Sequence, residues 1–450
     1  MTYKKLFLAL PVAMVTMALT TSCSLEQDEY FGESASLRVT HQNETIKNRL
    51  VAQSSADKYG WVIQYFVAGT DDYNFEGFNL FGRFNSNGTV TLAGDHKFLR
   101  NGNAGQYTEH TSYYDMLAEE GSVLAFNTWN DILTVFVDPV DPTKAPGQLV
   151  NNGEGMYGDQ NLVLKKLGDT DIQFYGERHG AITRFVPCDR PWQQYINDTQ
   201  DMKNRLATST LTAYYVINGI DTMYIKDLNK GLFVYGERIN DPLQKKTLKC
   251  VFTPKGFRLE RPETLGESSF QEFTIDNDTT SLFNEDGKVK VVACWDTYMV
   301  SHNAIWEMDT TFYTDTQKVL YAELAQMVNK FNSSWSLKSI GFGKSTGGNS
   351  LNGVVISCYT NSAKTKTNTL GFEVLQNRES YGEISVKPTA TVKTDNNMNA
   401  VEKKVPGFIA KVHEFVETLY GVYNVTPNDY FLPTGGLYTA TDGGTTFKIQ

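Results

Sequence analysis

The sequence predicts an α+β fold in which antiparallel β-meanders are each packed by a single helix. Four segments repeat apolar residues every three to four positions, which is typical of amphipathic helices. The segments between them are β-rich and end in Asn-Gly and similar turns, which favour hairpins over parallel crossovers. Aromatic residues make up 12% of the 450 residues, and such a composition suits β-sheets.

Each predicted helix has an apolar stripe that a sheet must cover. The first carries Val39, Ile46 and Leu50 and is expected to end at Gly60. The other three are expected at 191–206, opened by Pro191, at 314–331, opened by a capping box of Thr314 and Gln317, and at 406–421, opened by Pro406 and closed by Gly421.

The predicted strands are short apolar runs separated by turn residues. The Asn-rich segment 85–88 and the pair Asn218-Gly219 are expected to form hairpin turns. The strands are expected at 61–67, 77–84, 89–92, 213–217, 222–225, 289–295 and 353–359.

The first 22 residues are predicted to be a lipoprotein signal peptide. Lys4 and Lys5 precede an apolar stretch at 6–19, which is too short to span a bilayer. The segment resembles a bacterial lipoprotein signal, and this implies that Cys23 becomes the lipidated first residue of the mature chain. Leu19 stands four positions before Cys23, where the usual pattern has three. An ordinary cleaved signal followed by an unmodified cysteine is the alternative.

Residues 23–34 are expected to form an acidic tether. Glu26, Asp28 and Glu29 resemble the Bacteroidota export signal that sends lipoproteins to the outer face of the outer membrane. A tether that merely stays solvated would carry the same charges. No later window has the roughly 20 apolar residues of a membrane helix. The predicted localisation is therefore the outer membrane, facing the cell surface, with the membrane lipid held through Cys23.

Beyond the tether, three domains are predicted: an N-terminal helix-plus-meander domain at 35–190, a middle β-rich domain at 191–310 and a C-terminal α+β domain at 311–450. The run at 174–178 (FYGER) recurs as VYGER at 234–238. The helix-then-meander order also begins three times, near residues 36, 191 and 315. Duplicated units would explain both features, and chance would explain a four-residue identity.

Charge and cysteine spacing exclude several classes of protein. The net charge is −10 and no Lys/Arg run occurs, so nucleic acid is not an expected partner. The six histidines form no HExxH motif and the cysteines form no CxxC motif, so neither a metal nor a cofactor is expected. The later cysteines are open to two interpretations, disulfides or buried small hydrophobes: Cys188, Cys250, Cys294 and Cys358.

The remaining motif matches lack the neighbouring residues or elements that their chemistry requires. Ser345 lies in a GxSxG match at 343–347, but no parallel strand and helix flank it, so a hairpin loop is expected. Asp276 begins an incomplete calcium loop, because Ser281 and Gly287 replace its required glycine and glutamate, and a turn is expected. The pair Glu119-Glu120 is expected to be an exposed loop charge rather than a glycosidase carboxylate.

Four stretches together resemble an uncharacterised family of Bacteroidota surface lipoproteins, a domain of unknown function. They lie at 60–65 (GWVIQY), 78–92 (FNLFGRFNSNGTVTL), 112–139 and 161–180. The resemblance covers much of 35–190. Members are commonly encoded beside SusC/SusD-type outer-membrane importers and a predicted zinc metallopeptidase. The family therefore implies a SusC/SusD-like importer as partner, but it brings no catalytic residues.

The leading functional prediction is a non-catalytic accessory lipoprotein that captures oligopeptide or oligosaccharide for a SusC/SusD-like nutrient importer. The alternatives are a surface hydrolase with an unrecognised carboxylate site and a purely structural partner of the transporter. No catalytic residue is predicted. Ligand contacts are expected in polar loops that carry aromatic side chains, at Tyr73, Phe75 and Trp129. Tyr73 is favoured among them, and a place in the core is the alternative for Trp129, which follows an apolar strand.

Overall fold

The computed structural model describes residues 33–69, 75–139, 155–207, 213–236, 246–277, 280–301 and 304–450. The predicted signal peptide lies outside these residues, as does the tether up to residue 32. The chain forms two compact units. The first runs to Gln193 apart from Phe75–Gly77, and the second contains Phe75–Gly77 and Gln194–Gln450. The three-domain division stays a prediction, because these units do not test whether 191–310 and 311–450 fold separately.

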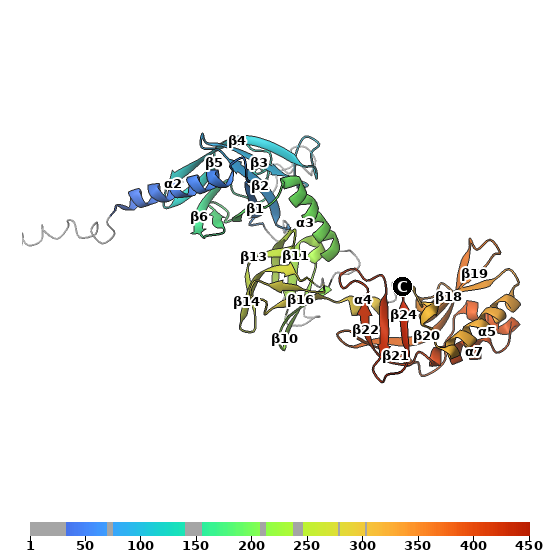
Figure 1. The fold of residues 1–450 in the computed structure, drawn as a ribbon. Coiled ribbons are helices and arrows are strands. Elements are labelled where there is room, and N and C mark those ends of the chain that lie inside the picture. Colours follow the sequence, from blue (N-terminus) through green and yellow to red (C-terminus); the bar gives the residue numbers. More distant parts are fainter. Residues whose placement is uncertain are drawn as a thin grey trace, which may run out of the picture. The chain divides into compact units, whose positions relative to one another are not determined.

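The first unit is a closed antiparallel barrel of eight strands (Figure 1). Each strand pairs with the next along the chain, and β1 closes the barrel against β8 in a register that runs from Trp61↔Pro187 to Phe66↔Ile182. The strands are β1 (Trp61–Phe66), β2 (Phe78–Phe84), β3 (Thr89–Gly94), β4 (Thr108–Ala118), β5 (Ser122–Phe126), β6 (Asn161–Leu167), β7 (Ile172–Gly176) and β8 (Ile182–Pro187).

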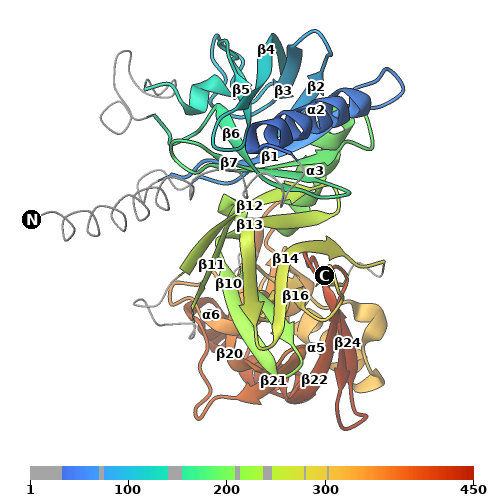
Figure 2. The ribbon, with the colours of Figure 1, turned by 90° about the vertical axis from the view of Figure 1, so that its left-hand side faces the viewer.

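Helix α2 (Ala35–Gln53) packs against β2, β4 and β5 of this barrel (Figures 1 and 2). Ser34 caps its N-terminus by accepting from the amide of Leu37. Ile46 and Leu50 are fully buried, and the Nε1 of Trp61 donates to the Leu50 carbonyl (3.0 Å). The predicted helix is confirmed in position, but it ends at Gln53 rather than at Gly60.

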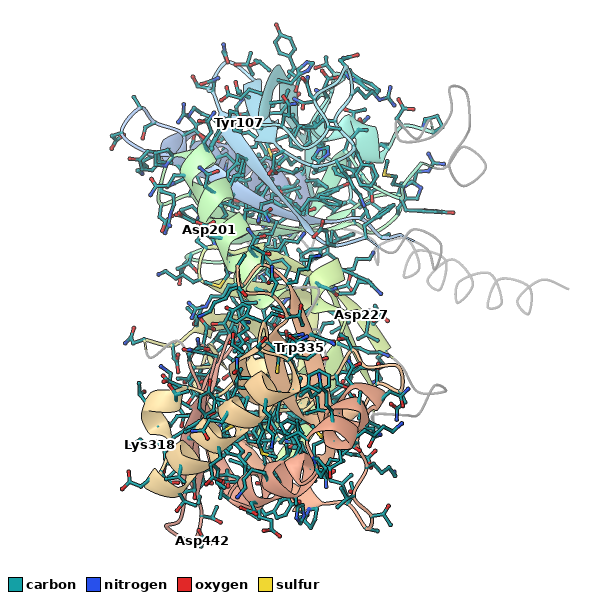
Figure 3. The ribbon with its side chains drawn as sticks, turned by 90° about the vertical axis from the view of Figure 1, so that its right-hand side faces the viewer. Tyr107, Asp201, Asp227, Lys318, Trp335 and Asp442 are labelled. Carbon is teal, nitrogen blue, oxygen red and sulfur yellow. The ribbon has the colours of Figure 1, made fainter. Side chains whose placement is uncertain are left out.

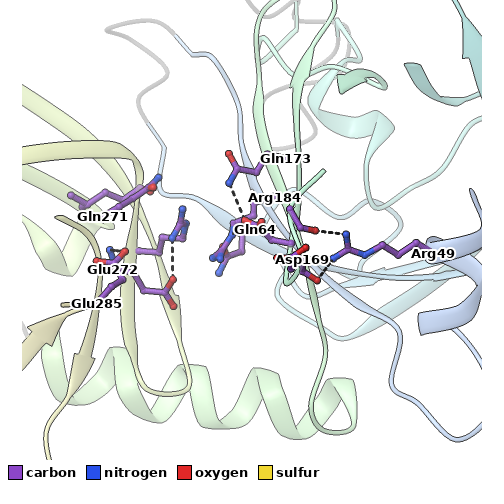
Figure 4. A network of polar contacts seen from close by, with 12 residues as sticks. Arg49, Gln64, Asp169, Gln173, Arg184, Gln271, Glu272 and Glu285 are labelled. Carbon is purple, nitrogen blue, oxygen red and sulfur yellow. Dashed lines mark hydrogen bonds and ion pairs between the residues drawn. The ribbon is translucent and has the colours of Figure 1, made fainter. Parts of the chain in front are cut away.

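A second attachment of α2 runs through Arg49 (Figure 4). Its guanidinium donates to the backbone carbonyls of Gly168 and Asp169, in the turn between β6 and β7. Asp171, in the same turn, accepts from Arg184 Nε at 2.6 Å. Burial favours a raised pKa for Asp171, but the hydrogen bonds from Arg184 and Gln173 outweigh it, so the pKa is lowered. These contacts hold the helix and the turn to one side of the first barrel.

Helix α3 (Trp192–Leu206) connects the two units in sequence. Its first two residues belong to the first unit, and the rest, from Gln194, belongs to the second. The helix matches the predicted one. Eight strands follow and form a second closed barrel, with β9 paired to β16. They are β9 (Ala213–Asn218), β10 (Asp221–Lys226), β11 (Leu232–Gly236), β12 (Lys246–Thr253), β13 (Gly256–Leu265), β14 (Ser268–Ile275), β15 (Leu282–Asn284) and β16 (Lys290–Ala293).

The last part of the chain forms an eight-stranded sheet in sequential order. Backbone hydrogen bonds between 307–309 and 448–450 also join its two edges, for example from the Asp309 amide to the Lys448 carbonyl (2.8 Å). The strands are β17 (Trp306–Glu307), β18 (Ser336–Lys344), β19 (Asn352–Tyr359), β20 (Thr367–Ser380), β21 (Glu383–Pro388), β22 (Gly421–Pro427), β23 (Gly436–Ala440) and β24 (Thr446–Ile449).

Three helices cover this third sheet: α5 (Asp315–Phe331), α6 (Asn396–Lys404) and α7 (Phe408–Glu417). Helix α5 packs on α7 and β18 (Figure 1). Helix α6 packs on β20 (Figure 2). The predicted capping box is confirmed, because the Gln317 amide donates to Thr314 Oγ1 (3.2 Å) and the Thr314 amide donates to Gln317 Oε1 (3.0 Å). The fourth predicted helix begins later than expected, at Phe408, after Gly407 in the left-handed region.

The fold is mixed α+β, as predicted, but two of the three described sheets close into barrels, and so the expected arrangement of open meanders under single helices is too simple. Strand β1 shows the physical reason. All six of its residues are buried, so it behaves as a strand covered on both faces rather than as a half-exposed meander strand. The segment expected to be a strand at 289–295 is also shorter, because Trp295 begins the short helix α4 (Trp295–Met299).

Candidate ligand-binding groove

The outer face of β2, β3 and β4 in the first barrel forms the floor of a groove. Arg83 on β2 lies opposite Thr91 on β3, which in turn lies opposite Thr111 on β4. Glu109 lies two residues from Thr111 on β4 and is exposed, so its side chain points to the same outer face. Three neighbouring strands therefore present a guanidinium, hydroxyls and a carboxylate side by side.

One wall of the groove comes from two segments far apart in the sequence. Tyr59 precedes β1, and Trp192 begins α3. The indole Nε1 of Trp192 donates to the Tyr59 carbonyl at 2.6 Å, which fixes the two segments together. Gly60 follows Tyr59 with φ at 71°, and a Cβ there would lie 2.5 Å from the Gly82 carbonyl oxygen. Only glycine lets the chain pass this close to β2 and place Tyr59 at the wall.

Arg83 is held in place by its contact with Trp192. Its Cζ lies 5.3 Å from the centroid of the indole ring, within the range of a cation–π interaction. Phe81 packs on the same indole, with ring centroids 5.7 Å apart. The one hydrogen bond recorded for the Arg83 side chain is long, 3.4 Å from Nη2 to the Lys58 carbonyl. Most of its N–H donors therefore have no protein acceptor among the described residues.

The far end of the groove is a tyrosine–carboxylate pair. The Tyr107 hydroxyl donates to Oε1 of Glu109. Burial and this hydrogen bond raise the pKa of Tyr107, so its hydroxyl stays protonated. Figure 3 labels Tyr107 among the side chains of this barrel. The bond fixes the direction of the Glu109 carboxylate.

The groove encloses about 390 Å³, with Pro191 and Gln193 completing its lining. This volume is at the lower end of the range for small-molecule sites. Among the described residues that line it, Glu109 is the one carboxylate, and no histidine, cysteine or serine is present. The arrangement offers aromatic surface, hydrogen-bond donors and acceptors. It offers neither a nucleophile paired with a base nor two carboxylates, which acyl transfer and glycoside hydrolysis require.

Most of the predicted site residues lie outside the described residues. These are Cys23, Glu26, Asp28, Glu29 and Tyr73. The lipid attachment, export signal and ligand contact predicted for these residues therefore stay predictions.

Phe75 is described and partly buried. It belongs to the second unit, where its neighbour Glu76 forms an ion pair with Lys203 and the Gly77 amide donates to the Cys250 carbonyl. Trp129 belongs to the first unit.

Trp129 lies after β5 and is 43% exposed. Its Nε1 donates to Oδ1 of Asp131 (2.6 Å), and His110 Nδ1 lies 2.9 Å from the other carboxylate oxygen. The guanidinium of Arg100 lies over its ring, 5.1 Å from the centroid. Trp129 is therefore an ordered surface residue rather than part of the core, but it does not line the groove.

The other motifs occupy structural positions. Ser345 lies in the loop between the antiparallel strands β18 and β19, so the GxSxG match is a hairpin, as expected. Asp276 accepts from the Thr280 and Ser281 amides, which is a turn. The four later cysteines are buried free thiols. In the described ranges, no cluster of three or more His, Cys, Asp or Glu side chains is placed to hold a metal ion.

The two copies of the Tyr-Gly motif fall on strands that are not equivalent. The first is on β7, the seventh strand of its barrel, and the second is on β11, the third strand of the next. The motif therefore does not mark corresponding positions of a repeated unit.

Sequence reasoning missed the groove because its parts come from four separate segments, near residues 58–60, 83–91, 107–109 and 191–193. One signal was present. Arg83 on β2 and Thr91 on β3 are polar residues between apolar neighbours, and Glu109 is an exposed residue of β4. The closing contact, between Trp192 and Tyr59, has no signal in the sequence.

The fold and the groove define a β-barrel protein with a candidate small-ligand site. A family model described as a domain of unknown function (DUF4302) matches residues 27–277. The match spans more than half of the chain, so the chain belongs to this family. No curated protein matches it.

Among solved structures, the β subunit from the DNA polymerase of Streptococcus pyogenes aligns over 90% of this chain and 97% of its own, at 9% identity and a TM-score of 0.12. At that TM-score the alignment carries no argument about fold or function. In the described part of the chain, no helix has both the length and the apolar character needed to cross a bilayer.

Proposed function

We propose that the chain is a surface-exposed outer-membrane lipoprotein that captures a nutrient ligand, oligopeptide or oligosaccharide, for a SusC/SusD-like importer. The observation that carries the capture role is the groove of the first barrel, where Arg83 keeps free donors beside the exposed ring of Tyr59. The anchoring role rests on Cys23 and the apolar segment before it.

The anchor is tested by Cys23→Ala, which removes the attachment point of the lipid. The variant should move from the outer-membrane fraction to the soluble fraction in cells that lack the importer. Replacing Glu26, Asp28 and Glu29 with Ala should leave the protein anchored but remove its accessibility to protease on whole cells. A Cys23→Ala chain that stays with the membrane would contradict the lipoprotein proposal, and unchanged protease accessibility would contradict the export signal.

The partnership is tested by affinity purification of the intact lipoprotein from solubilised outer membranes. Co-elution of an importer, together with binding of a peptide or glycan pool by the purified protein, supports capture. Co-elution without any ligand binding would instead support the purely structural role.

A surface hydrolase is the second candidate, and one observation favours it. The side chains of Glu119 and Glu177 share a hydrogen bond, which together with their charge repulsion raises the pKa of Glu119. A paired acid and carboxylate is what glycoside hydrolysis uses. Both lie on the exposed surface, without the apolar surroundings that hold a catalytic acid protonated. Hydrolysis of a glycan pool that is lost in Glu177→Gln would establish this candidate.

We also propose that the first two barrels descend from one duplicated unit of a helix followed by eight strands. The same strand count, the sequential pairing and the closure of first strand on last support it. Sequence similarity between the two halves, measured strand by strand across the family, would test this origin.

A further inference from the structure

We infer that the groove binds a short segment of an uncharged oligosaccharide, with Arg83 and Glu109 hydrogen-bonded to its hydroxyls and Tyr59 stacked on a ring face. This inference rests on the proposed capture function and narrows its ligand to one class. Three properties of the groove lead to it: its closed floor, its balanced charges and its aromatic wall.

The middle of the floor cannot bind a peptide through the main chain. Peptides commonly bind to sheets by adding a strand at a free edge, where unpaired amides and carbonyls are available. Here β3, the middle strand of the floor, is paired on both sides, with β2 and β4, whereas β4 pairs with β5 only from Tyr114 onward and not at Glu109. Because the face of β3 has no free edge, recognition over the middle of the groove must come from side chains.

The charges in the groove balance. Arg83 brings one positive and Glu109 one negative charge to the lining. A ligand with a net charge would meet one favourable and one unfavourable partner. Vicinal sugar hydroxyls both donate and accept, so they can satisfy the Arg83 donors and the Glu109 oxygens without a net charge. Thr91 and Gln193 add further donors and acceptors to the lining.

Of the two aromatic residues in the wall, only Tyr59 exposes its side chain enough for a ligand to contact it. Tyr59 is 41% exposed, whereas Trp192 is 8% exposed and already packs against Arg83 and Phe81. The groove therefore has no deep apolar pocket for a large peptide side chain. A flat exposed ring beside polar groups suits the apolar face of a sugar ring.

The experiment measures binding by isothermal titration, using the full chain with Cys23→Ala to keep it in solution. Three probes are compared: neutral hexa-oligosaccharides of glucose, xylose and mannose, oligouronates of the same length, and a tryptic peptide pool. We expect binding in the neutral set and at least tenfold weaker binding of the oligouronates and peptides.

Three variants and one control variant locate the site. Arg83→Met should weaken binding of the neutral oligosaccharide by about tenfold or more, because charge-assisted hydrogen bonds are lost. Tyr59→Ala should weaken it by about fivefold through lost stacking. Tyr113→Ala is the matched control, because Tyr113 is a 58% exposed tyrosine on β4 that does not line the groove, and it should bind like the parent. Glu109→Gln, which keeps the side-chain shape, covers the case in which Arg83→Met fails to fold.

The outcomes separate this inference from the proposed function. Peptide or oligouronate binding that depends on Arg83 would overturn the neutral-sugar class while leaving capture in the groove intact. Neutral-sugar binding that is unchanged in Arg83→Met, Tyr59→Ala and Glu109→Gln would overturn the location. Absence of binding by all three probes would overturn this inference, and absence of a co-purifying importer as well would overturn the proposed function.

Discussion

His96 should make the stability of the first barrel depend on pH. Its Nε2 donates to the Ile132 carbonyl at 2.9 Å, and the ring packs against Phe78, Phe98 and Phe136. The side chain is buried, and its Nδ1 has no hydrogen-bond partner among the described residues. Burial therefore lowers the pKa of His96 to about 4, from an ordinary value of 6.5.

The sign and size of the effect follow from proton linkage. The unfolded chain protonates this histidine below pH 6.5, whereas the folded chain resists protonation until about pH 4. The contribution of His96 to folding stability is therefore intact above pH 6.5 and is lost as the pH falls toward 4. A shift of this size amounts to about 3 kcal/mol in total, of which about 2 kcal/mol is lost by pH 5.

Urea denaturation at pH 7.5 and pH 5.0 measures this effect, with the parent and His96→Gln compared at each pH. Glutamine can still donate to the Ile132 carbonyl but does not titrate. Between the two pH values the parent should lose about 2 kcal/mol more unfolding free energy than the variant. His41→Gln, at an exposed histidine on α2, is the control and should follow the parent. Equal losses in the parent and in His96→Gln would refute the reasoning.

Three further substitutions test the second unit by thermal or urea unfolding. Leu324→Asp places an unpaired charge at a fully buried position of α5 and should lower the unfolding free energy by several kcal/mol. Val319→Asp, at a 58% exposed position of the same helix, is the control and should cost little. Equal melting temperatures of the two variants would show that the apolar face of α5 with Leu324 points to solvent. Arg378→Met removes the partner of the fully buried Asp296, 2.7 Å away, and should cost about 3–5 kcal/mol; a cost below about 1 kcal/mol would mean that the carboxylate is not desolvated. Thr314→Ala removes the N-cap of α5 and should cost about 0.5–2 kcal/mol, and no measurable loss would show that the capping box is not formed in solution.

The sequence predicted those parts of the fold that local chemistry determines. The capping box of Thr314 and Gln317, the helix after Pro191 and the hairpin at Asn218-Gly219 each depend on residues a few positions apart, and each is present. Helix ends were less well predicted. Gly60 was expected to end α2, but it serves instead in the close approach to β2.

Barrel closure could not be predicted, because it depends on pairs such as Trp61 and Pro187, which are 126 positions apart. The groove could not be predicted for the same reason. Neither Tyr59 nor Trp192 was predicted to line a site, and their hydrogen bond forms only once the barrel has closed. The prediction from loop polarity favoured Tyr73 and also included Trp129, which is at the surface. Loop polarity does not tell which surface aromatic residues lie beside unpaired hydrogen-bond donors.

Hydrogen–deuterium exchange, with and without a bound neutral oligosaccharide, tests most directly the central claim that ligand is captured in the groove of the first barrel. The account predicts slower exchange on binding in three separate segments, residues 57–60, 105–109 and 189–193, because all three border the groove. The amides around Tyr113 should be unaffected. Protection confined to the segment around Trp129 or to residues 70–76, with the three groove segments unchanged, would contradict the account.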